Sequence, residues 1–207
     1  MSALTDFQFR FCPVVYCHPD HLNTLTQYQQ FATLPDKYTQ PRLNKLLFDS
    51  FSLTADADEL TTLQQAILLS NTELQRFLTF CGSCFYLRDL TTRWPVPGLR
   101  RPFIALTTQD TALLLRWKSG LLLPLQHYQR SLTDTPDDES IIHVTGQQLW
   151  FYLIQESSLQ FRRRAELRFP VTVSPPVHFP DELTPLLNTL CLTILRSLTQ
   201  PACHSAV

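Results

Sequence analysis

The balance between glycine and proline is the feature that most constrains how this chain folds. Its 207 residues include only four glycines but fifteen prolines. Glycine supplies the left-handed backbone conformations of tight hairpin turns, whereas proline starts helices and interrupts loops. The sequence therefore predicts helices joined by proline-marked connections.

The apolar residues near the C-terminus recur at helical spacing. Pro180 and Asp181 are suitable residues to begin this helix, and Pro201 lies just past its expected end. The stripe on one helical face consists of Leu183, Leu186, Leu187, Leu190, Cys191, Ile194 and Leu198. We expect a helix over about 183–198.

A second helix is predicted to run from Ser70 to Leu87. Ser70 can cap the first turn while Glu73 reaches back to the Ser70 backbone, the reciprocal arrangement of a capping box. The apolar stripe passes through Gly82 and consists of Leu74, Phe77, Leu78, Cys81 and Phe85.

Shorter apolar stripes predict four more helices. One follows Pro41, one follows the acidic residues Asp56, Asp58 and Glu59, one follows Thr108, and one ends near Ile154. Their apolar residues are Leu43, Leu46, Leu47 and Phe51; Leu60, Leu63 and Ile67; Leu113, Leu114 and Trp117; and Leu149, Trp150, Leu153 and Ile154.

Two stretches alternate between apolar and polar residues instead. They cover 7–11 and 167–173, and Pro170 would place the second at a sheet edge. The predicted fold class is therefore mainly α, a compact helical domain with one short two-stranded β element around 7–11 and 167–173. We treat residues 1–207 as a single domain, with a hinge or mobile loop near 130–140 because 133–140 is acidic and polar.

The six cysteines are interpreted as reduced thiols that mostly serve as small core residues. They stand at 12, 17, 81, 84, 191 and 203, and no secretion signal precedes them. The closest approach to a zinc site is the group Cys12, Cys17, His18 and His21. Its spacing fits poorly, and Cys81 of the second pair, Cys81 and Cys84, lies on an apolar helical stripe. We therefore predict no metal and no cofactor.

No motif for catalysis is recognisable in the sequence. There is no Gly-x-Ser-x-Gly turn, no Gly-rich phosphate loop and no His-Glu-x-x-His pair. The acidic clusters at 56–59 and 137–139 fall where helices are expected to begin, and carboxylates are stabilised there by the helix dipole. We predict no catalytic residues and a protein that is not an enzyme.

Charge and hydropathy favour protein partners. The net charge of −1 argues against nucleic-acid binding, and the apolar runs are too short to insert into a membrane. We expect a cytoplasmic protein. Candidate residues for acidic partner surfaces are Arg88, Arg93, Trp94, Arg100, Arg101, Arg162, Arg163 and Arg164, and candidates for a basic partner surface are Asp137, Asp138 and Glu139. A solvated face is the alternative explanation for an arginine run.

Several segments are similar to one known family. They are Phe7-Gln8-Phe9-Arg10-Phe11-Cys12-Pro13 with Tyr16 and 18–22, Phe48-Asp49-Ser50-Phe51-Ser52-Leu53, Leu167-Arg168-Phe169-Pro170, and Thr189-Leu190-Cys191 with Thr199, Pro201, Cys203 and His204. In this order they resemble the K component (SctK, YscK-like) of the bacterial type III secretion sorting platform. The resemblance spans nearly the whole chain and is weakest over about 91–140.

The resemblance implies a non-catalytic cytoplasmic adaptor, peripheral at the inner-membrane face of the secretion apparatus. Such a protein links the Q-type pod (C-ring-like) protein to the cytoplasmic domain of the D-type inner-membrane ring protein. Through the pod it connects indirectly to the L-type stalk protein and the export ATPase. The alternative is a type III secretion chaperone or regulator that binds effector proteins, which would need an exposed apolar groove and usually a homodimer. An obligate dimer would favour this alternative. An enzyme of unrecognised type is the third possibility.

Overall fold

The chain folds into helices connected by short turns. The computed structural model describes residues 2–28, 36–54, 59–133, 135, 137–171 and 179–199. Within these ranges the regular elements are α-helices and 3₁₀ turns, without a strand, so the prediction of a mainly α fold is confirmed. No helix in the described part of the chain is both long and apolar enough to cross a membrane.

The contacts within the chain group into two compact units. Unit 1 comprises residues 1, 70–153 and 176–207, and unit 2 comprises residues 2–69 and 154–175. The chain therefore runs from unit 2 into unit 1, back to unit 2, and ends in unit 1. The prediction of one domain over 1–207, with a hinge near 130–140, stays a prediction.

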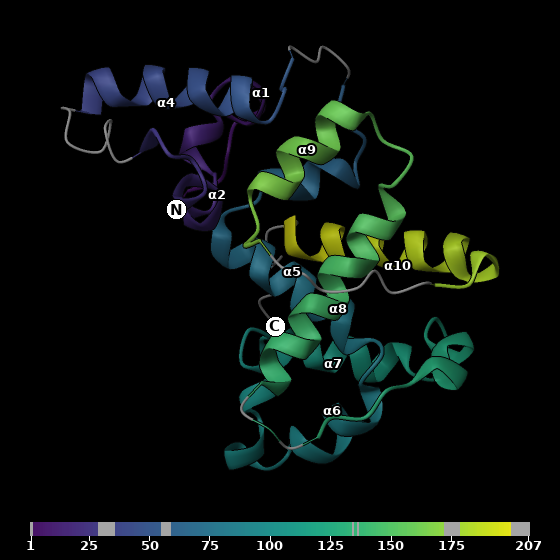
Figure 1. Cartoon of the computed structure of the whole chain (residues 1–207). Coiled ribbons are helices and arrows are strands. Elements are labelled where there is room, and N and C mark those ends of the chain that lie inside the picture. The colour runs from purple at the N-terminus through teal and green to yellow at the C-terminus, as the bar shows by residue number, and fades with distance from the viewer. Residues whose placement is uncertain are drawn as a thin grey trace, which may run out of the picture. The chain divides into compact units, whose positions relative to one another are not determined.

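Unit 1 is built around the crossing of α5 and α8, with α10 packed against both (Figure 1). Its α-helices are α5 (Asn71–Ser83), α6 (Leu87–Arg93), α7 (Thr108–Trp117), α8 (Asp138–Leu153) and α10 (Thr184–Thr199). Its 3₁₀ turns are η3 (Pro97–Leu99), η4 (Arg101–Phe103), η5 (Leu123–Tyr128) and η6 (Asp181–Leu183). The inward face of α10 consists of the buried residues Leu187, Leu190, Cys191, Ile194 and Leu195.

Two glycines allow the backbones of α5 and α8 to touch. A Cβ atom added to Gly82 would lie 2.0 Å from the carbonyl oxygen of Ile142, and one added to Gly146 would lie 1.8 Å from that of Leu78. Any side chain at either position would collide with main chain rather than with a movable side chain. Gly82 is therefore a packing requirement of α5.

Unit 2 contains α1 (Asp6–Phe11), α2 (Pro19–Asn23), α4 (Asp36–Ser50) and α9 (Leu159–Leu167), with the 3₁₀ turns η1 (Pro13–Val15) and η2 (Gln64–Leu68). In its core the Phe9 ring lies between Tyr16 and Phe161, with centroid separations of 5.4 and 5.6 Å. The Tyr16 hydroxyl donates to the Phe9 carbonyl oxygen, and burial raises the pKa of this phenol.

Buried arginines join distant parts of unit 2. Arg164 donates to the carbonyl oxygens of Arg10 and Thr54, and its guanidinium lies 5.7 Å from the centre of the Phe48 ring. Arg168 donates to the carbonyls of Ile67 and Leu69, and burial lowers its pKa to about 10. These side chains satisfy main-chain acceptors that no helix or sheet satisfies.

The predicted two-stranded β element does not form. Residues 7–11 lie in α1, where Thr5 and Gln8 form a capping box and the rings of Phe7 and Phe11 pack 5.1 Å apart. Leu167 ends α9, and the residues from Arg168 to Val171 follow without regular structure. Residues 172–173 lie outside the described residues. A five-residue alternation was too short to outweigh the capping signal.

The predicted helices over 70–87 and 60–67 are shorter than expected. Ser70 and Glu73 form the predicted capping box, but α5 ends at Ser83. The side chain of Gln129 accepts from the Leu87 N–H at the start of α6 and donates to the Cys84 carbonyl after the end of α5. The side chain of Gln129 thus caps the C-terminal end of α5 and the N-terminal end of α6. Around Ile67 only the turn η2 forms, and Asp56 and Asp58 lie outside the described residues.

The other predicted helices are present with shifted ends. The helix expected after Pro41 begins earlier, at Asp36, and includes Pro41. The helix expected near Thr108 is capped by Thr107, and the one containing Trp150 extends back to Asp138. The C-terminal helix matches the prediction, while Pro201, Cys203 and His204 lie outside the described residues.

Candidate interaction surface

The segment after α6 is shaped by prolines and by two 3₁₀ turns, η3 and η4. In such a turn, residues three apart lie on the same face. The Leu99 N–H donates to the Val96 carbonyl at 2.9 Å, and the Ile104 N–H donates to the Arg101 carbonyl at 3.2 Å. Val96 therefore lies beside Leu99, and Arg101 beside Ile104.

The large apolar side chains of this segment point outward. The exposed fractions are 47% for Val96, 50% for Leu99 and 69% for Ile104. Pro102 and Phe103 are buried between them, where η4 packs against α8. We refer to Val96, Leu99, Arg100, Arg101 and Ile104 as the 96–104 surface. Large apolar side chains exposed this close together in sequence make the segment a candidate binding surface.

The two arginines of the 96–104 surface are exposed. The Arg100 Nε donates to the Trp94 carbonyl, and its guanidinium lies 5.2 Å from the centroid of the Trp94 ring. Within the described residues, no carboxylate forms an ion pair with Arg100 or Arg101. The sequence between Asp89 and Asp110 contains no acidic residue, so the local charge is positive.

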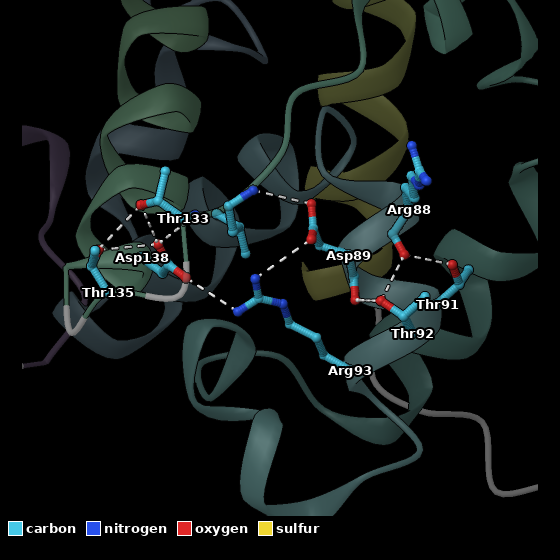
Figure 2. Close-up of polar contacts among 9 residues, drawn as sticks. Arg88, Asp89, Thr91, Thr92, Arg93, Thr133, Thr135 and Asp138 are labelled. Carbon is cyan, nitrogen blue, oxygen red and sulfur yellow. Dashed lines mark hydrogen bonds and ion pairs between the residues drawn. The ribbon is translucent and has the colours of Figure 1, made fainter.

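Arg93, by contrast, is buried in an ion-pair network (Figure 2). Its Nη1 lies 3.1 Å from a carboxylate oxygen of Asp138, and its Nη2 lies 3.5 Å from one of Asp89. The Asp138 carboxylate also accepts from the Thr133 N–H and from the hydroxyls of Thr133 and Thr135. The network ties α6 to the start of α8 and to the chain that precedes it.

The sequence placed Arg93 and Asp138 on two different partner surfaces, and the structure brings them into contact with each other. Of the neighbouring candidates, Arg88 and Asp137 are exposed, and Trp94 and Glu139 are half-buried. A binding role for these residues stays a prediction. Asp89 was missed, although its place four residues before Arg93 on a helix is a recognisable ion-pair spacing.

The arginine run 162–164 belongs to unit 2 and is mostly turned inward. Arg164 is buried, and Arg162 and Arg163 are half-buried. Arg163 donates to the Ser52 carbonyl oxygen at 3.1 Å, and the side-chain amide of Gln160 donates to the same oxygen. The run therefore supports the loop after α4, and its binding role likewise stays a prediction.

Three of the four zinc-site candidates, Cys17, His18 and His21, have other surroundings in the structure. Burial raises the pKa of the Cys17 thiol to about 12. The His18 Nδ1 caps α2 by accepting from the Asp20 N–H, and the His21 Nε2 lies 2.9 Å from the Phe169 carbonyl oxygen. In the ranges that the structure describes, no three His, Cys, Asp or Glu side chains are grouped so as to hold a metal ion.

Desolvation also raises the pKa of Cys81 and of Cys84, both fully buried in unit 1. The Sγ atom of Cys81 lies 3.7 Å from that of Cys191, and both side chains are part of the α5–α10 packing. These thiols have the environment of core residues rather than of reactive nucleophiles.

A family sequence model described as YOP proteins translocation protein K (YscK) matches residues 3–206. The chain belongs to the YscK family. Two relatives, the Yop proteins translocation protein K of Yersinia pseudotuberculosis serotype I (strain IP32953) and that of Yersinia enterocolitica, are each 26% identical over 206 residues. Each alignment covers 98% of this chain and 97% of the relative.

A solved structure has the same helical fold. The cytoplasmic domain of the type III secretion sorting platform protein PscK from P. aeruginosa matches with a TM-score of 0.67 and 22% identity. The match covers 99% of this chain and 100% of that one. The helical fold is thus shared at low sequence identity.

Proposed function

We propose that this protein is a non-catalytic cytoplasmic adaptor of a type III secretion sorting platform. In this role it links the Q-type pod protein to the cytoplasmic domain of the D-type inner-membrane ring protein. The observation that carries the proposal is the YscK family match, which extends over residues 3–206. The thiols of Cys17, Cys81, Cys84 and Cys191 are buried, and His18 and His21 are hydrogen-bonded, in keeping with structural roles for these side chains.

An adaptor has to hold its binding surfaces in place, and the interior of unit 1 is suited to this. The main chains of α5 and α8 touch at Gly82 and Gly146. The segment that carries the 96–104 surface follows α6 directly, and α6 is fixed to α8 by the Arg93–Asp138 ion pair. Little conformational entropy is then left to be lost on binding.

The test is co-purification of the full chain with its two proposed partners from the same bacterium. We expect the chain to capture the Q-type protein and the D-type cytoplasmic domain separately and to form one complex with both, as seen by size-exclusion chromatography with light scattering. Failure to capture either partner would contradict the adaptor role. An obligate homodimer of the free chain would instead favour the chaperone alternative.

A further inference from the structure

We infer that the 96–104 surface is a docking site for an acidic, apolar segment of a partner protein. The inference deepens the proposed function and rests on it for the choice of partner proteins. Its own basis is the coincidence, in nine residues of sequence, of three exposed apolar side chains and two arginines without an acidic neighbour.

The charge of the surface selects the chemistry of the partner. Arginine presents a planar fork of donors that matches a carboxylate in a bidentate pair. Arg100 and Arg101 have no such partner among the described residues, while the nearby Arg93 already has two. A partner carboxylate brought to Arg100 or Arg101 would therefore form an ion pair that none of the described residues of the chain forms.

The apolar residues select for a segment that also carries apolar side chains. Val96 and Leu99 share one face of the segment, and Arg101 shares a face with Ile104. Covering Ile104 removes water from around Arg101, which strengthens an ion pair there. A partner segment with apolar side chains next to carboxylates would satisfy both demands at once.

The surface is also prepared for binding before a partner arrives. Stacking on Trp94 and a hydrogen bond to its carbonyl hold the Arg100 guanidinium in place, and the buried residues Pro102 and Phe103 fix the turn beneath it. A side chain that is already ordered loses less entropy when it pairs.

An anionic membrane is the competing occupant, and the composition disfavours it. Membrane-binding basic clusters usually contain about four to eight Lys and Arg residues, each worth roughly fivefold in affinity. The 96–104 surface has two arginines and no lysine, and the chain has a net charge of −1.

The experiment uses the full chain with two test variants and one control. The first test variant is Arg100→Glu with Arg101→Glu, and the second is Leu99→Ser with Ile104→Ser. The control is Arg42→Glu with Lys45→Glu, which makes the same charge change at two exposed positions of α4. Circular dichroism and thermal unfolding are used to check that each variant folds as the wild type does.

The probes are a fluorescein-labelled peptide that alternates Glu with Leu, the same peptide with Lys in place of Glu, phosphatidylglycerol vesicles, and the Q-type and D-type proteins. We expect the acidic peptide and one of the two proteins to bind the wild type and the control, and to bind both test variants about tenfold more weakly or worse. The Lys peptide should not bind.

A loss of peptide or protein binding that is specific to the test variants supports the inference. Equal behaviour of test variants and wild type with the peptides and both proteins, including no binding at all, overturns it, as does a loss confined to the vesicles. If the wild type captures neither protein but binds the acidic peptide through Arg100 and Arg101, the adaptor function fails and the docking site stands. If the test variants still capture both proteins and bind the acidic peptide as the wild type does, the docking site fails and the adaptor function stands.

Discussion

At the scale of single residues, the arginines differ by what their guanidinium groups contact. Arg93 is paired with two carboxylates, whereas Arg164 and Arg168 donate hydrogen bonds to main-chain carbonyl oxygens. Arg100 and Arg101 are exposed. The sequence showed arginines beside aromatic residues but could not separate these classes. The carboxylate of Asp138 lies 45 residues from Arg93, and only the tertiary fold brings the two together.

Truncating either member of the Arg93–Asp138 pair should destabilise unit 1. We expect Arg93→Ala and Asp138→Ala each to lower the free energy of unfolding by about 3 kcal/mol. Arg93→Ala removes the ion-pair partner of the buried Asp138 carboxylate, and Asp138→Ala removes the shorter of the two ion pairs of Arg93. The double variant should lose less than the sum, with a coupling of about 1 kcal/mol or more. Urea unfolding followed by tryptophan fluorescence measures this, since Trp94, Trp117 and Trp150 all belong to unit 1.

Arg88→Ala provides the control for this cycle. Arg88 is on the same helix but exposed, so its removal should change stability by no more than about 0.5 kcal/mol. Strictly additive losses in the double variant would show that Arg93 and Asp138 do not stabilise unit 1 through each other.

At the scale of elements, the sequence predicted the helices that have long apolar stripes and missed those that depend on distant contacts. Helix α10 matches its stripe, whereas α5 ends early because Gln129 caps it from far along the chain. The capping box of Thr5 and Gln8 was present in the sequence and would have corrected the strand predicted at 7–11. The exposed apolar residues of the 96–104 surface could not have been distinguished from core residues in the sequence, because a 3₁₀ turn of three residues is too short to give a recognisable apolar periodicity.

The contact of α5 with α8 depends on two glycines. We expect Gly82→Ala and Gly146→Ala each to destabilise unit 1 by about 2–3 kcal/mol, because the added methyl group meets a carbonyl oxygen and the helices must move apart. The measurement is the urea midpoint of the tryptophan transition.

Gly98 and Gly120 supply matched controls within the same unit. A Cβ at either position meets no atom within 4 Å, and neither glycine has a positive φ. Alanine there should be neutral or stabilising by up to about 1 kcal/mol, because it restricts the unfolded chain. A loss at Gly98 or Gly120 as large as at Gly82 would mean that helix separation is not the cause.

At the scale of the whole molecule, the division of the chain could not be predicted from hydropathy. Periodicity reports which face of each helix is buried but not which helices pack together, and α9 and α10 belong to different units although they are neighbours in sequence. The resemblance over the whole chain identified the family without this information.

Unit 1 should depend on its last helix. A chain that ends at Val171 lacks α10, whose buried face covers α5 and α8. We expect this truncated chain to show red-shifted tryptophan emission and no cooperative urea transition, since the exposed core can no longer pack. A chain that ends at Thr199 keeps all of α10 and should unfold like the full chain; equal unfolding of the two truncations would contradict the role given to α10.

The alternation of the chain between the units has a consequence for its synthesis. Unit 2 cannot close until α9 has been made, because Arg164 and Arg168 bind the carbonyls of Arg10 and Ile67 from the far end of the chain. The core of unit 1 cannot be completed until α10 has been synthesised. Most of the polypeptide must therefore leave the ribosome before either core is complete, and the nascent chain exposes apolar helix faces that a ribosome-associated chaperone can recognise.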